Sequence, residues 1–207
     1  SFIYASSSSV YGGIRELPFK ENTKVDNPLN LYAATKMSNE LISSAYSHLF
    51  DIQMTGLRFF TVYGPWGRPD MAPFKFLRKI LKNEPIDIYN NGEHSRDFTF
   101  VDDIVEGITL VSQSHFKDNA SYSHTVYNIG NGQPIKLMSF IEALEEVTGK
   151  KAIKNFMPKQ PGDMDDTLAD LSKISSDLGY LPRTSLHDGL QRLVMWYRDH
   201  EDFLNTI

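Results

Sequence analysis

The sequence contains no cysteine, which excludes a disulfide framework and a thiolate metal site. It has no uninterrupted apolar run of membrane-spanning length, and no basic segment followed by an apolar leader. The net charge is −5, which argues against nucleic acid or an anionic membrane as a general partner. The six histidines show no metal-ligand spacing. These absences are consistent with a cytoplasmic protein that has no metal site.

A Gly-x-Gly-x-x-Gly dinucleotide fingerprint is also absent. Glycines gather at Gly12-Gly13 and at Gly130-Asn131-Gly132, but neither group follows a strand and opens a helix at the required spacing. The chain opens on Ser1-Phe2-Ile3-Tyr4-Ala5, a run that is typical of the middle of a buried strand. We therefore expect the natural protein to be longer at its N-terminus.

The 207 residues are 41% hydrophobic and 23% charged, as in an ordinary soluble globular protein. Apolar residues recur at helical spacing in several segments, and short apolar runs lie between them. The spacing predicts helices over residues 29–49, 73–81, 101–113, 137–148, 171–178 and 185–199. Strands are expected over residues 2–5, 53–60, 86–89, 97–100, 126–129 and 152–156. This alternation predicts an α/β protein with an at least partly parallel sheet.

The most informative feature is the pair Tyr32 and Lys36, which lie four residues apart in the helix expected at 29–49. Residues at i and i+4 share one face of a helix. A cation held beside a tyrosine stabilises the phenolate, which can then take a proton from a substrate alcohol near neutral pH. The alternative is a solvated helix face, because such a short motif often occurs by chance.

The serine cluster Ser6-Ser7-Ser8-Ser9 ends the first expected strand and precedes the Tyr/Lys pair. With this context, the chain resembles the extended short-chain dehydrogenase/reductase family of sugar-nucleotide-modifying enzymes. The resemblance covers essentially the whole chain. It is strongest at Ala5–Gly12, Leu31–Lys36, Leu57–Ala72, Arg96–Asp103 and Gly162–Asp170.

The resemblance implies the C-terminal part of a Rossmann-type parallel sheet, from about its fifth strand onward, plus a smaller mixed α/β substrate-binding portion. Residues 1–64 would form a partial NAD-binding portion with the catalytic residues. Residues 65–207 would mainly bind the UDP-sugar, with some segments returning to the Rossmann sheet. Family members carry the glycine-rich phosphate loop in an N-terminal region that has no match here. We therefore expect this fragment to bind NAD weakly or not at all, and to be inactive alone.

The activity that the resemblance implies is NAD-dependent 4-epimerisation of a UDP-sugar through a 4-keto intermediate, with conversion of UDP-glucuronate to UDP-galacturonate favoured. Related dehydratases and decarboxylases place an Asp or Glu where this chain has Ser8 and Ser9. Hydroxyls at these positions therefore support epimerisation. Three alternatives stay open: an epimerase of another UDP-hexose, a UDP-sugar-binding fragment without catalysis, and a structural interaction domain.

By resemblance, Ser7 and Tyr32 lie at the reacting 4-hydroxyl of the sugar, and Lys36 holds the nicotinamide ribose. Ala5 and Phe59 would border the cofactor together with Tyr32 and Lys36. The alternative for the serines is a helix cap or a polar strand end. The alternative for Phe59 is a place in the core of a buried strand.

Arg68 is the candidate for the substrate carboxylate, because a guanidinium fork can bind both oxygens of a carboxylate. The alternative is a solvent-exposed loop arginine. Arg96 resembles the family's pyrophosphate-binding arginine, and its alternative is a surface pair with Asp97. Asp87 and Tyr89 match positions that frame the uracil, with core packing as the alternative for Tyr89.

The resemblance also implies further substrate-binding positions, which are Ser8, Ser9, Thr61 and Asp163. The expected partner is a UDP-sugar, with no nucleic acid and no membrane. An open sheet edge and uncovered apolar faces would favour a homodimer or higher self-association. The apolar residues of the C-terminal helix are expected in the core; these are Leu190, Leu193, Val194 and Trp196.

Overall fold

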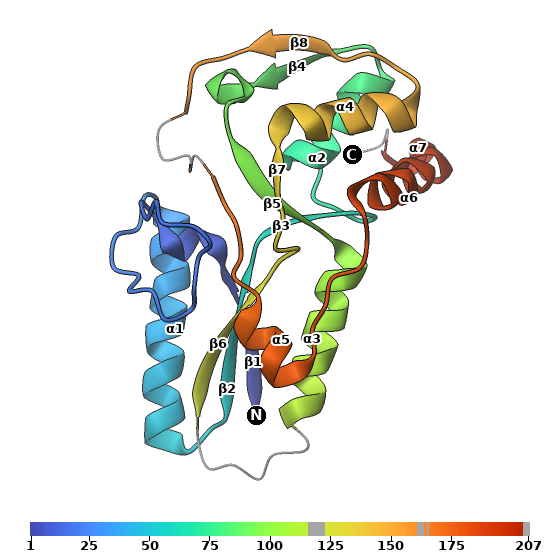
Figure 1. The fold of residues 1–207 in the computed structure, drawn as a ribbon. Coiled ribbons are helices and arrows are strands. Elements are labelled where there is room, and N and C mark those ends of the chain that lie inside the picture. The colour runs from blue at the N-terminus through green and yellow to red at the C-terminus, as the bar shows by residue number, and fades with distance from the viewer. Residues whose placement is uncertain (116–122, 161–163, 165, 205–207) are drawn as a thin grey trace.

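A three-stranded parallel sheet with helices on both faces forms the lower part of the molecule in Figure 1. The computed structural model describes residues 1–115, 123–160, 164 and 166–204. Helix α1 packs on one face of the sheet, and α3 and α5 pack on the other (Figure 1). The strands, in spatial order, are β1 (Phe2–Ser7), β2 (Met54–Phe59) and β6 (His124–Ile129), and the helices are α1 (Leu31–Phe50), α3 (Val101–His115) and α5 (Ser172–Leu178). This arrangement confirms the predicted α/β class with parallel strands.

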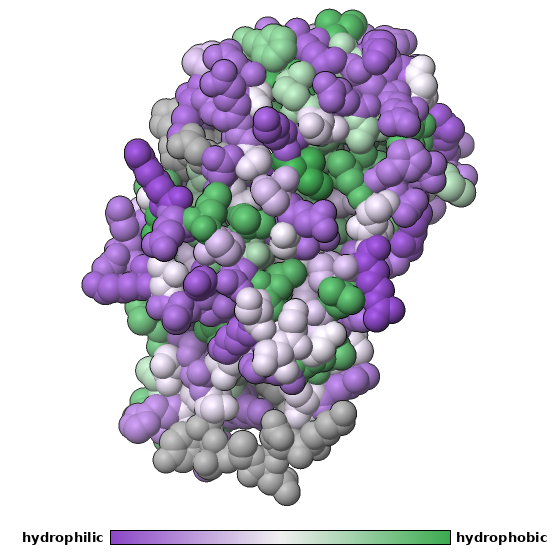
Figure 2. Space-filling view, viewed as in Figure 1, coloured by the Kyte–Doolittle hydropathy of each residue, from purple (hydrophilic) through white to green (hydrophobic). Residues whose placement is uncertain are grey.

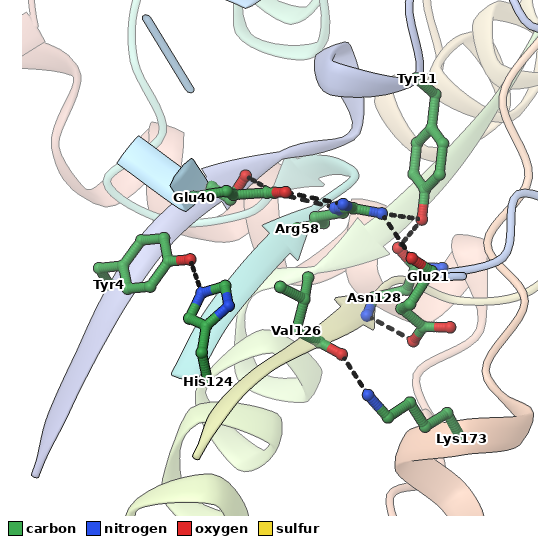
Figure 3. Close-up of polar contacts among 10 residues, drawn as sticks. Tyr4, Tyr11, Glu21, Glu40, Arg58, His124, Val126, Asn128 and Lys173 are labelled. Atoms are coloured by element: carbon green, nitrogen blue, oxygen red, sulfur yellow. Dashed lines mark hydrogen bonds and ion pairs between the residues drawn. The ribbon is translucent and has the colours of Figure 1, made fainter. Parts of the chain in front are cut away.

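The two faces of this sheet differ in polarity. Toward α3 and α5, Leu57 and Ile129 pack with apolar residues such as Ile104 and Ile174. Toward α1 the sheet carries polar side chains, which include Arg58 and Asn128 (Figure 3). Ser6 belongs to the same group, since its hydroxyl donates to Glu40 on α1. Helix α1 buries small or polar residues against this face, namely Ala33, Glu40, Ser43 and Ser47.

The helix predicted over residues 29–49 is confirmed as α1, but most of its large apolar residues point outward. Leu41, Ile42 and Leu49 are 72%, 58% and 68% exposed. Tyr46 is half exposed on the same helix. The outer face of α1 is therefore more apolar than the face that packs on the sheet.

The upper part of the molecule is built from short strands and helices around its own core (Figure 1). Strand β5 pairs in parallel with β3 and antiparallel with β7, and β4 pairs in parallel with β8. The rings of Phe98 and Phe140 stack at the centre of this core, with 4.2 Å between centroids. The elements are β3 (Thr61–Tyr63), α2 (Ala72–Leu81), β4 (Pro85–Ile88), β5 (Ser95–Phe100), β7 (Pro134–Lys136), α4 (Leu137–Thr148), β8 (Ile153–Phe156), α6 (Leu186–Asp199) and α7 (Glu201–Leu204).

Helix α6 contributes Leu190, Leu193 and Val194 to this core as buried residues, and Trp196 packs against it partly buried. The core position predicted for the C-terminal helix is therefore confirmed. On the face drawn in Figure 2, hydrophilic residues cover much of the upper part, and hydrophobic ones gather nearer the middle of the molecule.

Four segments differ from the predicted elements. Strands β3 and β7 lie in segments for which the sequence predicts no strand, because strands of three residues leave too short a pattern to recognise. The strand expected at 86–89 ends one residue early, and Tyr89 opens the short 3-10 turn η2 (Tyr89–Gly92). The serine cluster divides between β1 and the 3-10 turn η1 (Ser8–Tyr11).

Asp97 on β5 binds two segments that are distant from it in the sequence. Its carboxylate accepts hydrogen bonds from the backbone N–H groups of Asn131 at 2.6 Å, Gly132 at 3.0 Å and Ala169 at 3.0 Å. The side chain is fully buried. The alternative of a surface pair between Arg96 and Asp97 is therefore wrong.

The outer edge of β6 is covered by charged side chains (Figure 3). Lys173 donates to the carbonyl of Val126 at 2.9 Å, and Glu21 accepts from the N–H of Asn128 at 2.8 Å. These contacts occupy main-chain groups that would otherwise be open to another strand. Among the described residues, no helix combines the length and apolar character needed to cross a bilayer.

Candidate active site

An open cleft of about 740 Å³ lies at the carboxyl ends of β1 and β2. Parallel α/β sheets characteristically bind ligands at this edge. Helix α1 supplies two residues to the cleft, and the chain after β2 supplies its far wall. The predicted residues that line it are Ala5, Ser7, Ser8, Ser9, Tyr32, Lys36, Phe59, Thr61 and Arg68.

Tyr32 and Lys36 lie in the first turns of α1, where the side chain of Asn30 caps the helix by accepting from the N–H of Ala33 at 2.8 Å. The ammonium of Lys36 lies 5.8 Å from the centroid of the Tyr32 ring. It also donates to the carbonyl of Ala5 at 2.9 Å. Lys36 therefore ties α1 to the end of β1 and places a positive charge beside a half-exposed phenol.

We call Ser6–Tyr11 the serine segment, since it runs from the end of β1 through η1. The hydroxyl oxygen of Ser7 accepts from the N–H of Ser9 and lies 3.1 Å from the Ser9 hydroxyl. Ser7 is thus the N-cap of η1 as well as a residue of the cleft wall. The alternative of a helix cap is therefore correct for the local geometry of Ser7, and the capping residue also lines the cleft.

Arg68 lies on the loop after β3 and is exposed, which agrees with the alternative of a solvent-exposed loop arginine. Its Nε and Nη2 atoms bind the two carboxylate oxygens of Asp70 at 3.0 and 2.5 Å. The guanidinium therefore already holds a carboxylate in the two-point geometry that the prediction requires. Because this ion pair is exposed to solvent, exchange of Asp70 for another carboxylate costs little.

A second pocket of about 240 Å³ shares Thr61 and Met71 with the cleft. Its lining includes Asp87, Tyr89 and Arg96, which the sequence analysis assigned to the nucleotide. Phe76, Phe98 and Leu137 also line this pocket, and all three are buried in the upper core. The pocket therefore continues the cleft and combines an apolar lining with an acid, a phenol and a guanidinium.

Asp87 accepts a hydrogen bond from Asn155 at 2.8 Å, and this bond lowers the pKa of the Asp87 carboxyl. Arg96 donates to the carbonyls of Ser95 at 3.0 Å and Met164 at 2.7 Å. Tyr89 is half-buried and lines the pocket. Asp163 lies outside the described residues.

The sequence analysis missed a buried polar network beneath the cleft (Figure 3). Glu40 and Arg58 form its ion pair, with 2.7 Å between Oε2 and Nη2, and both side chains are almost fully buried. One signal could have found Glu40, because it lies one turn after Lys36 on the same face of the helix.

The chain is similar to known proteins both in sequence and in structure. Residues 1–130 match the family described as "NAD dependent epimerase/dehydratase family". The chain is 48% identical to protein CapI of Staphylococcus aureus, over 97% of this chain and 64% of that protein. It is 45% identical to the probable UDP-glucuronate 4-epimerase of Rhizobium meliloti, over 93% of this chain and 60% of that protein.

A solved structure of the UDP-glucuronic acid 4-epimerase from Bacillus cereus, in complex with UDP-glucuronic acid and NAD, is similar throughout this chain. The TM-score is 0.88 at 36% identity, over 96% of this chain and 61% of that one. This chain thus spans less than two thirds of the length of each of these proteins.

Proposed function

Because the chain belongs to the NAD-dependent epimerase/dehydratase family, we propose that it acts in the 4-epimerisation of UDP-glucuronate to UDP-galacturonate. The observation that carries this proposal is a cleft and an adjoining pocket, which share Thr61 and Met71 and differ in chemistry. The cleft holds Ser7, Tyr32 and Lys36, and the adjoining pocket holds Asp87 and Arg96. The 36% identity to an enzyme crystallised with UDP-glucuronic acid and NAD supports this choice of substrate.

The cleft fits the nicotinamide end of NAD. Phe59 and Phe60 supply apolar surface next to the ammonium of Lys36, which is fixed by the carbonyl of Ala5. When bound, NAD accepts a hydride from C4 of the sugar and later returns it to the opposite face. We propose that residues 1–64 form the cofactor side of the protein, and that residues 65–207 mainly bind the UDP-sugar.

In the proposed reaction, the Tyr32 phenolate takes the proton of the sugar 4-hydroxyl as C4 becomes a ketone. Ser7 donates a hydrogen bond to the oxygen at C4, and Lys36 stabilises the phenolate by its charge. The keto-sugar turns over in the cleft, and Tyr32 gives the proton back when C4 is reduced again. Atoms and electrons balance, since the proton and the hydride both return to the sugar.

In the proposed complex, different residues bind the sugar and the nucleotide of the substrate. Arg68 exchanges Asp70 for the carboxylate of the glucuronate, and Arg96 faces the pyrophosphate. Asp87 and Tyr89 frame the uracil, with Thr61 between the two regions and Ser8 and Ser9 at the sugar.

The test of the catalytic assignment is Tyr32→Phe, with Tyr46→Phe as a matched control on the same helix. Both tyrosines are about half exposed, at 52% and 50%, but Tyr46 does not line the cleft. Conversion of UDP-glucuronate to UDP-galacturonate with NAD is followed by chromatography. We expect Tyr32→Phe to lower kcat by about 10²-fold or more. Equal rates in the two variants would remove the assignment. The assay uses the 207-residue chain and, in parallel, the product of the whole reading frame that encodes it.

The carboxylate role of Arg68 predicts a change in specificity. A charge-assisted hydrogen bond contributes about 1.5–3 kcal/mol, so Arg68→Ala should raise KM for UDP-glucuronate about 10- to 100-fold. KM for UDP-glucose, which has no carboxylate, should change much less. Equal changes in KM for the two substrates would contradict this role.

A second candidate function is UDP-sugar binding without catalysis, which the pocket around Asp87, Tyr89 and Arg96 favours. Calorimetry with UDP and with NAD separately distinguishes the two candidates. Binding of UDP without binding of NAD, together with no turnover, would favour the binding function. Arg96→Ala should weaken UDP binding, whereas Arg198→Ala, an exposed arginine on α6, should not.

We also propose that the chain self-associates as a homodimer or a larger assembly through the outer face of α1. The exposed apolar residues Leu41, Ile42, Tyr46 and Leu49 support this proposal, since isolated domains rarely expose such a continuous face. Light scattering should give a mass above that of one chain, and Leu41→Glu with Leu49→Glu should reduce it. A monomer at high protein concentration would contradict self-association.

A further inference from the structure

We propose that the buried ion pair between Glu40 and Arg58 positions the serine segment, because it holds that segment at both of its ends. Glu40 and Arg58 would be positioning residues, since neither lines the cleft. The effect on kcat that this inference predicts rests on the proposed function. The effect on amide hydrogen exchange in the serine segment does not.

The first end of the segment is held by Glu40. Its Oε1 atom accepts from the hydroxyl of Ser6 at 2.5 Å and from Nε of Arg58 at 2.9 Å. Its Oε2 atom accepts from Nη2 of Arg58 at 2.7 Å. Both carboxylate oxygens are thus occupied by donors within the protein, and the residue is only 7% exposed.

The second end is held by Arg58 (Figure 3). Its Nη1 atom donates to the Tyr11 hydroxyl at 3.1 Å, and the guanidinium carbon lies 4.9 Å from the centroid of that ring. The Tyr11 hydroxyl in turn donates to Oδ1 of Asn128 at 2.6 Å. Burial raises the pKa of Tyr11 to about 12, so the hydroxyl keeps the proton that this bond requires.

Ser6 lines the cleft together with the three serines that follow it, Ser7, Ser8 and Ser9. Glu40 lies on the same face of α1 as Tyr32 and Lys36, at intervals of one helical turn. The ion pair therefore connects the helix that carries the phenol and ammonium to the strand end that carries the serine hydroxyls.

A buried ion pair is poor evidence for stability, because removing both charges from water offsets most of their attraction. It is directional, however, since a bidentate guanidinium fits a carboxylate in one plane. An apolar pair of similar volume would fill the space, but the Ser6 hydroxyl would lose its acceptor and the Tyr11 hydroxyl would lose the hydrogen bond from Arg58. The geometry thus points to placement of the serine segment as the consequence of this pair.

Ser6→Ala and Tyr11→Phe test the inference, because each releases one end of the segment while the ion pair stays intact. The matched control is Tyr180→Phe, which also removes a hydroxyl from a fully buried tyrosine. Tyr180 donates to the carbonyl of Gly130 at 2.9 Å and does not line the cleft. We measure kcat and KM for UDP-glucuronate, and amide hydrogen exchange in peptides from residues 6–11.

We expect Ser6→Ala and Tyr11→Phe each to lower kcat about tenfold or more while KM changes less than about twofold, because reacting groups are misplaced while binding contacts remain. Amide exchange should become faster in residues 6–11 and stay unchanged in β4 and β8. Tyr180→Phe should alter neither kcat nor exchange in the serine segment.

If Tyr11→Phe and Tyr180→Phe have the same kcat, the positioning role is overturned. If the product of the whole reading frame does not turn over UDP-glucuronate, the proposed function fails, and hydrogen exchange still decides this inference. Unchanged exchange over residues 6–11 in both Ser6→Ala and Tyr11→Phe would overturn it.

Discussion

Substitution of Asp97 by asparagine should destabilise the protein strongly without changing its shape. The Oδ1 atom accepts from the N–H of Asn131, and Oδ2 accepts from the N–H groups of Gly132 and Ala169. Asparagine has one acceptor oxygen and one NH₂ group. Whichever way the amide is turned, its NH₂ group faces at least one buried N–H donor.

The size of the effect follows from the number of donors that lose their acceptor. A buried donor left without a partner costs about 1–3 kcal/mol. If the NH₂ group takes the place of Oδ2, two backbone N–H donors lose their acceptor. If it takes the place of Oδ1, one backbone N–H donor and the Thr99 hydroxyl lose their acceptor. Burial raises the pKa of Asp97, which shows that the carboxylate carries a desolvation penalty that asparagine avoids in part. We therefore expect a net loss of about 2–3 kcal/mol in the free energy of unfolding.

The assay is urea unfolding followed by circular dichroism, with Asp87→Asn as the control. Asp97→Asn should lower the urea midpoint with an unchanged m-value, and should lower Tm by about 4–12 °C. Asp87 accepts its hydrogen bond from Asn155 at the surface, so Asp87→Asn should leave the urea midpoint almost unchanged. Equal midpoints for the two variants would refute the argument from buried hydrogen bonds.

Three further predictions concern other parts of the molecule. Burial acts to raise the pKa of Glu145, but hydrogen bonds from two lysines and a backbone N–H lower it to about 2. The ionised Glu145 therefore contributes to stability above pH 4.5, and this contribution is lost as pH falls from 4.5 toward 2. Glu145→Gln should show a smaller decrease in stability across this window than the wild type, and parallel curves would contradict the assignment. In Gly189→Ala, the new Cβ would lie 2.3 Å from the Tyr63 hydroxyl. Overpacking costs about 1–3 kcal/mol and outweighs the gain of about 1 kcal/mol in helix propensity, so Tm should fall. A higher Tm would show that the core adapts. Lys173→Ala combined with Glu21→Ala should uncover the edge of β6 and increase self-association in light scattering; an unchanged mass would show that these side chains do not protect the edge.

The sequence by itself determined where most helices and strands form. Helix α4 has the predicted bounds, and α1 was predicted within two residues at its N-terminus and one at its C-terminus. This succeeded because helix and strand patterns are set by neighbours within one or two turns of the chain. The spacing of Tyr32 and Lys36 is equally local, so their common helix face could be predicted. The family could also be predicted, and the match over residues 1–130 confirms it.

Tertiary structure alone decided which face of α1 is buried and which partners the internal charges take. The apolar spacing of α1 predicts a helix, yet the sheet beneath it is polar, so Glu40 is buried while Leu41 is exposed. Asp97 follows Arg96 directly but accepts from residues more than thirty positions away. A local pattern contains no information on such partners, because pairing across long separations depends on how the whole chain brings buried donors and acceptors together.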